Sequence, residues 1–323
     1  MADSDVTIRR ATPADLSRIV EVGAAALGWR SGEPNETLFR WKHLDNPFGQ
    51  SPMWVAEADG RIAGYRVFMR WELLDQEGRL KRAVRAVDTA THPDFQRRGV
   101  FRSLTSAAVD EMIDEGVDLV FNTPNGQSLP GYLKLGWESL GRIPVAARLT
   151  SPTGLLRLRG ARQPAAKWSE ASGAGVPARD VDADVVGGLM AESAPSGLRT
   201  RLGPDLVRWR FGLDELKYRV WAPDGPEAGV VYFRVRRRGT ARECAVSLVL
   251  TPPDRPGGAG SLVAGLSRAV DADSLLMLGR RWPGARSVPV PGQGPVLAVR
   301  SLATAAPESV TEWDLQLGDI ELF

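Results

Sequence analysis

Three arginines and a glycine lie together in the segment THPDFQRRGVFRSLT, residues 91–105, where a predicted strand gives way to a predicted helix. A helix start exposes backbone N–H groups without partners and carries a partial positive charge, so it favours anions, phosphates above all. Gly99 would let the backbone approach a ligand closely, and Arg97, Arg98 and Arg102 could add charge-assisted hydrogen bonds. The segment predicts an anion site, with a solvated basic turn as the alternative.

The flanking sequence predicts the elements that position this segment. Helical periodicity follows Thr12-Pro13, Asn35 and Gly99, whereas Asp59-Gly60 marks a tight turn between two β-rich runs. The predicted order is a strand (6–11), two helices (12–27 and 35–44), a hairpin (53–74), a strand (83–91), a helix (100–115), a buried strand (117–124), a short helix (127–135) and a final strand pair (138–149). This order predicts the α+β class, a mixed and mostly antiparallel sheet flanked by helices.

The second half of the chain echoes the first after a stretch rich in Pro, Gly, Ala and Ser. TLFRWK at residues 37–42 is answered by DLVRWR at 205–210, which places Trp41 and Trp209 in matching positions. We therefore predict two tandem domains, residues 1–150 and 181–323, joined by a linker at 151–180. Chance similarity between short strands is the alternative.

Composition limits the classes of function. The net charge of +2 argues against wholesale nucleic-acid binding. A single cysteine, Cys244, excludes a disulfide within the chain and a Cys-rich metal site, and no metal is expected. The first residues lack the apolar core of a signal peptide, and no stretch reaches the roughly 20 apolar residues of a membrane span. We expect a cytoplasmic protein without a membrane partner, either a monomer or a homodimer.

The order of these motifs closely resembles the GNAT superfamily of acyl-CoA-dependent N-acyltransferases. The family motif Arg/Gln-x-x-Gly-x-Gly/Ala is matched by Gln96-Arg97-Arg98-Gly99-Val100-Phe101, the strand DTATHP precedes it, and GYLKLGW follows at residues 131–137. The resemblance covers residues 6–149. Phe101 departs from the small residue usual in the family, so its ring must point away from the phosphates for the coenzyme to bind.

The resemblance implies a donor site for acetyl-CoA or another acyl-CoA, used as a co-substrate. Backbone amides of the loop would hold the pyrophosphate, the strand edge would pair with the pantetheine arm as an added strand, and Asn125 would hold that arm from the other side. A backbone amide of the strand edge could also polarise the thioester carbonyl. The implied coenzyme-binding residues are Thr89, Ala90, Thr91, Gln96, Arg97, Arg98, Gly99, Val100, Phe101, Arg102 and Asn125.

Acyl transfer also needs proton transfers. Tyr132 matches the family's usual general acid, and a phenol ordinarily has a pKa of about 10; anchoring a helix is its alternative role. Asp88 is our candidate base because it lies near the implied thioester, with a water relay left open. His43 and Trp41 are candidates for acceptor binding; helix capping is the alternative role of His43, and core packing is that of Trp41.

The implied acceptor is the primary amine of a small molecule. An amino sugar comes first because RWKHLDNP, residues 40–47, resembles GNAT proteins of bacterial glycan and secondary metabolism. The second half has no matching motif and no tyrosine equivalent to Tyr132, so we expect it to complete the acceptor cleft or to stabilise the fold. A non-catalytic scaffold that binds acyl-CoA or a metabolite is the rival interpretation.

Overall fold

The structure is a computed structural model, and it describes residues 6–30, 32–150, 154, 157, 164–192, 197–252, 258–279 and 284–322. The first half contains β1 (Thr7–Arg10), α1 (Leu16–Leu27), α2 (Asn35–His43), β2 (Met53–Ala58), β3 (Arg61–Leu74), β4 (Leu80–Thr91), α3 (Val100–Asp114), β5 (Leu119–Asn122), α4 (Leu129–Leu133), β6 (Glu138–Arg142) and β7 (Val145–Leu149). The second contains β8 (Ser169–Glu170), β9 (Val176–Pro177), α6 (Ala183–Glu192), β10 (Arg199–Thr200), α7 (Pro204–Gly212), β11 (Arg219–Trp221), β12 (Val230–Arg238), β13 (Ala241–Leu250), α8 (Gly258–Ala269), β14 (Ser274–Leu278), β15 (Val288–Pro289), β16 (Val296–Ser301) and α9 (Leu317–Ile320).

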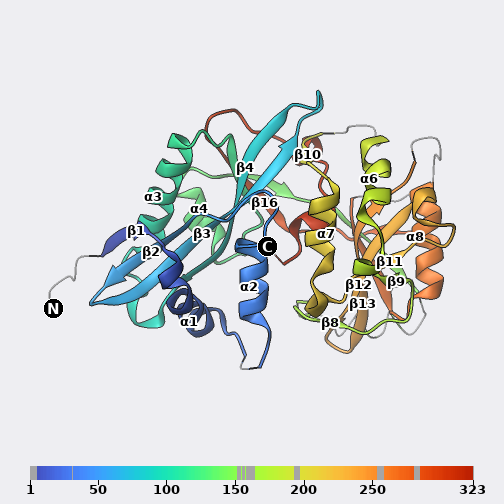
Figure 1. Cartoon of the computed structure of the whole chain (residues 1–323), viewed down its shortest axis with the longest axis horizontal. Helices are drawn as coiled ribbons and strands as arrows, with labels where there is room; N and C mark the ends of the chain where they lie inside the picture. The colour runs from blue at the N-terminus through green and yellow to red at the C-terminus, as the bar shows by residue number, and fades with distance from the viewer. Residues whose placement is uncertain are drawn as a thin grey trace.

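Within the described residues, two mixed sheets of eight strands each form the frame of the molecule (Figure 1). The first runs β1-β2-β3-β4-β5-β16-β6, with β10 also paired to β3, and the second runs β15-β7-β14-β13-β12-β11-β9, with β8 paired to β12. The pairs β4–β5 and β13–β14 are parallel, and the other strand pairs are antiparallel. The predicted α+β class and the mostly antiparallel sheets are confirmed.

The two sheets exchange strands across the middle of the chain. β16, from the C-terminal part, lies between β5 and β6 in the first sheet, whereas β7 belongs to the second sheet and pairs with β14. The prediction that β6 and β7 pair with each other is therefore wrong. The residues between them, Ile143-Pro144, make no tight turn, and Ile143 N–H instead bonds to the carbonyl of Pro295 at 2.9 Å. The chain continues from one sheet into the other.

The first sheet opens between its two parallel strands. β4 and β5 pair only from Ala83↔Leu119 to Arg85↔Phe121, and β4 then continues alone to Thr91 on that side. A β-bulge lies in the same stretch, because the β3–β4 pairing passes from Val67↔Val87 to Tyr65↔Ala90. Two β4 residues, Asp88 and Thr89, thus lie opposite the single residue Arg66. The bulge bends the strand at the mouth of the gap.

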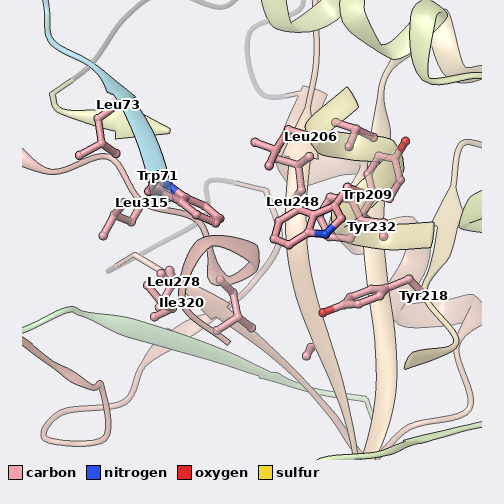
Figure 2. Close-up of a cluster of buried hydrophobic side chains, with 14 of the residues drawn as sticks. Trp71, Leu73, Leu206, Trp209, Tyr218, Tyr232, Leu248, Leu278, Leu315 and Ile320 are labelled. Atoms are coloured by element: carbon pink, nitrogen blue, oxygen red, sulfur yellow. The ribbon is translucent and has the colours of Figure 1, made fainter. Parts of the chain in front are cut away.

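One continuous hydrophobic core joins the two halves. Trp41 of α2 stacks on Trp209 of α7 at 4.6 Å between ring centroids, and each indole N–H donates to the backbone carbonyl of the other residue at 2.9 Å. Trp71 of β3 contacts Trp209 edge-on at 6.3 Å. Figure 2 shows Trp71 and Trp209 in one cluster with Leu248 and Ile320. The two hydrogen bonds are reciprocal, and they join residues that occupy matching positions in the two halves of the sequence.

Candidate active site

The loop before α3 is open to solvent. Residues 96–99 are exposed, and Arg97 and Gly99 have left-handed backbones with φ of 64° and 76°. The amide of Ser103 bonds to the carbonyl of Gly99 at 3.0 Å, so α3 begins here, and the amides of its first turn have no partner within the helix. A Cβ placed at Gly99 would meet nothing within 4 Å. The predicted anion loop has space in front of it.

The ring of Phe101 turns away from this loop and packs toward α4. It lies 5.4 Å from the ring of Tyr132, edge to face, and against Gly131. Val100, beside it, is buried under Gly64 of β3. The bulky residue at position 101 therefore fills the space between α3 and α4 and leaves the loop amides uncovered.

A buried polar group lies on the α3/α4 face of the first sheet, next to the gap. Arg66 Nη1 donates to the phenol oxygen of Tyr132 at 2.8 Å and also to Oγ1 of Thr89. Arg66 is fully buried and Tyr132 is 4% exposed. Residues from β3, β4 and α4 thus meet where β4 leaves β5.

A second charged group lies on the opposite, α1/α2 face. The carboxylate of Asp88 pairs with Lys42 and accepts a hydrogen bond from His43 Nε2 at 2.9 Å, while His43 Nδ1 lies 3.0 Å from Ser51 Oγ. The Asp88 side chain is 18% exposed, whereas those of Lys42 and His43 are buried. Asp88 has a left-handed backbone, with φ of 44°, which a non-glycine residue adopts at a cost of about 1 kcal/mol or more.

The environment of this group decides its protonation. Burial alone would raise the pKa of Asp88, but Lys42 and His43 outweigh it and hold that pKa well below its usual range. Burial lowers the pKa of His43, against the opposing effect of Asp88. At neutral pH the Asp88 side chain is therefore a carboxylate and the His43 imidazole is neutral, and Asp88 is a weak proton acceptor.

Comparison with known proteins identifies this arrangement. Residues 7–140 match the family model of the acetyltransferase (GNAT) domain, and they include the loop, the gap and both polar groups. Residues 7–140 form a GNAT domain. No curated protein matches the sequence of the chain.

Solved structures extend the likeness beyond the GNAT domain to the tandem fold. A probable N-acyltransferase from Enterococcus faecalis shares 11% identity over 93% of this chain and 73% of its own, with a TM-score of 0.66. A GCN5-related N-acetyltransferase from Anabaena variabilis shares 12% identity over 92% and 73%, with a TM-score of 0.65. Eis1 from Mycobacterium abscessus shares 15% over 93% and 74%, with a TM-score of 0.58. These similarities establish two tandem GNAT-like folds.

Two predicted site residues of the GNAT domain, Asn125 and Trp41, make their side-chain contacts outside both polar groups. Asn125 is exposed, and its side-chain oxygen accepts from the amides of Gln127 and Ser128, both at 2.9 Å, so it closes the turn before α4. Trp41 is buried in its stack with Trp209. Packing between the halves is the role that the contacts of Trp41 support, and His43, fully buried, reaches the site through Asp88.

Four residues in or near the two polar groups were not predicted from the sequence. Arg66 is a charged residue inside the apolar run IAGYRVFM, a signal that could have found it. Asn122 ends β5 with a buried side-chain oxygen that lacks a partner within the described part of the chain. Lys42 and Lys167 carry no comparable signal, because only the fold brings them to this face. Lys167 donates to Asn35 Oδ1 at 2.6 Å and lies 5.6 Å from the Trp29 ring centroid.

The corresponding gap of the second sheet is filled by the chain itself. β13 and β14 pair as far as Ala245↔Leu276, and beyond this point the side-chain amide of Gln316 bonds to both backbone groups of Val249, at 2.8 Å to the N–H and 3.4 Å to the carbonyl. Glu321 accepts a hydrogen bond from Ser247 at 2.5 Å. Residues 254–260 correspond to the loop before α3, and residues 279–290 correspond to the Tyr132 region. Both segments lie partly outside the described residues.

Metal ligands and membrane spans can both be assessed over the described ranges. These ranges contain no group of three or more His, Cys, Asp or Glu side chains placed to hold a metal ion. None of their helices is long and apolar enough to cross a membrane.

Proposed function

We propose that the protein is an N-acyltransferase that moves an acetyl or other acyl group from coenzyme A to the primary amine of a small molecule. The observation that carries this proposal is the free edge of β4 beyond Arg85, which runs from the buried phenol of Tyr132 to the exposed loop before α3. An extended ligand can pair with such an edge while its phosphates reach unpaired helix amides.

On the donor side, we propose that the amides of residues 96–102 bind the pyrophosphate and that Thr89, Ala90 and Thr91 pair with the pantetheine arm. Asn125 would hold the turn next to that arm. The transfer forms a bond between the amine nitrogen and the acyl carbon while the carbon–sulfur bond breaks. Tyr132 would give its proton to the sulfur atom that leaves.

On the acceptor side, we propose that Asp88 orients the amine and that a water molecule takes its proton. The lowered pKa of Asp88 favours this division of roles, because a strongly stabilised carboxylate binds cations well but accepts protons poorly. His43 and Lys42 would hold Asp88 in place. Amino sugars come first among candidate acceptors, and we place catalysis in the first half alone because Gln316 occupies the second gap.

Coenzyme binding tests the donor site. Gly99→Glu places a carboxylate where the pyrophosphate would lie, and Gly99→Gln is the matched control because it has nearly the same size and the same backbone strain. We expect Gly99→Glu to weaken coenzyme A binding in calorimetry by about 100-fold relative to Gly99→Gln, or roughly 3 kcal/mol. Equal affinities in the two variants would exclude the loop as the pyrophosphate site.

Turnover tests the reaction itself. Release of free thiol from acetyl-CoA, with a panel of amines that includes amino sugars, should fall by about 100-fold or more in kcat in Tyr132→Phe. Tight coenzyme binding without thiol release across the panel and several acyl donors would instead favour the non-catalytic binding protein.

A further inference from the structure

Arg66 is a buried cation surrounded by aromatic rings in the middle of β3. Its side chain is among the largest fully buried ones, and its guanidinium carbon lies 4.8 Å from the ring centroid of Phe68, 5.1 Å from that of Tyr132 and 5.6 Å from that of Phe101. A guanidinium without a neighbouring carboxylate is expensive to bury. A need for its charge at this place would explain why β3 keeps it.

The hydrogen bonds of Arg66 are concentrated at one atom. Nη1 bonds to Tyr132 and Thr89, whereas Nε and Nη2 have no hydrogen-bond partner in the described part of the chain. An arginine that served only to hold the fold would be expected to have most of its donors satisfied. Arg66 itself lies opposite Asp88 and Thr89 in the β3–β4 pairing, beside the gap in which the thioester would lie.

The direction of the bond to Tyr132 has a chemical consequence. Arginine can only donate, so the phenol oxygen accepts, and its own hydrogen must point elsewhere. The rings of Phe101 and Trp137 pack against the phenol ring. Arg300 of β16 lies over the Trp137 ring instead, 5.4 Å from its centroid, and its Nη1 donates to the carbonyl of Leu135. Arg66 is thus the charged group in contact with the phenol within the described residues.

We propose that Arg66 is a positioning residue for acyl transfer that acts through Tyr132. Because Arg66 donates a hydrogen bond to the phenol oxygen, the O–H group of Tyr132 points into the gap. The charge of Arg66 also stabilises the phenolate that remains when this proton has passed to the sulfur. Solvent then returns a proton to the phenolate. The inference rests on the proposed function, since it assigns a partner to the same acid.

A set of four variants tests this role: Arg66→Met, Arg66→Lys, Tyr132→Phe and the double variant Arg66→Met/Tyr132→Phe. We expect Arg66→Met to lower kcat by about 10- to 100-fold with little change in KM for acyl-CoA, and Arg66→Lys to restore most of the loss. With Tyr132 already replaced, loss of Arg66 should cost less than about 3-fold.

Equal losses with and without Tyr132, or no rescue by Arg66→Lys, would overturn the inference and leave Arg66 as a packing residue. If the wild-type protein shows no turnover, the proposed function fails, but the contact between Arg66 and the Tyr132 phenol can still be measured by NMR. The chain has four tyrosines. In NMR spectra of protein with isotope-labelled tyrosine, the phenol carbon signal of Tyr132 can be assigned because it is missing in Tyr132→Phe. The chemical shift of this carbon should change in Arg66→Met, and an unchanged shift would refute the contact between Arg66 and the phenol independently of activity.

Discussion

Buried charge at single residues is the feature that most constrains this site. Lys42, His43 and Asp88 occupy one face of the first sheet, and each depends on the others because a lone charge there would be costly. His43 is the member whose protonation changes nearest to neutral pH. Its behaviour can therefore be read in the stability of the whole protein.

The free energy of unfolding should fall as the pH drops below about 6.5, by up to about 1.4 kcal/mol per pH unit. Burial lowers the pKa of His43 in the folded protein, so over this range the unfolded chain binds a proton that the folded one does not. Denaturant titrations between pH 5 and 7 should show this slope in the wild type and lose it in His43→Gln.

The second histidine of the chain provides the control for that experiment. His92 is half-buried in the turn before α3, so His92→Gln should leave the slope intact. A slope that survives in His43→Gln, or that disappears in His92→Gln, would show that His43 is not held neutral by burial.

The first turn of α3 shows how an element prepares the site. Gly99 ends the loop with φ of 76°, a conformation that side chains with a Cβ disfavour, and no atom lies within 4 Å of the space where that Cβ would stand. Glycine at position 99 is thus required by the backbone conformation and not by crowding, and the proposed phosphates would occupy the open space in front of it.

Gly99→Ala should lower the free energy of unfolding by about 1 kcal/mol, through backbone strain and without a clash. Gly126 is the matched control, since it is also exposed and unobstructed but does not have a positive φ. Gly126→Ala should be neutral or slightly stabilising in the same chemical denaturation. Equal effects of the two substitutions would mean that the loop relaxes around residue 99.

At the scale of the whole molecule, the halves depend on each other for strands. β16 supplies the pairing partner of both β5 and β6, and β7 completes the second sheet. The core that contains Trp41, Trp71 and Trp209 also crosses between the halves. A cut between the halves would therefore leave sheet edges and apolar side chains open to solvent.

A fragment of residues 1–144 should fail to fold alone, because β5 and β6 would each lose their shared neighbour. We expect it to be aggregated or largely unstructured by size-exclusion chromatography and circular dichroism, and to become soluble when co-expressed with residues 145–323. A folded, monomeric fragment that binds coenzyme A would contradict this dependence and would support independent domains at the predicted boundaries.

The sequence by itself determined the order of elements in the first half, the α+β class, the repeat and the GNAT resemblance. Each depends on local signals, namely hydrophobic periodicity, helix caps, turn residues and a motif within one stretch of chain. Such signals can be read from a single sequence. The position of Gly99 at the start of α3 and the matching positions of Trp41 and Trp209 also follow from such local signals.

Only the tertiary structure decided that β16 enters the first sheet, that Arg66 bonds to Tyr132 and that Lys42 and His43 hold Asp88. These contacts join residues far apart in sequence, and a short strand such as β16 carries no local record of its neighbour. The β-bulge at Asp88 and Thr89 is similar, because it is defined by the register between two strands. The sequence thus predicted the donor loop, whereas packing alone assembled the charged groups on the two faces of the sheet.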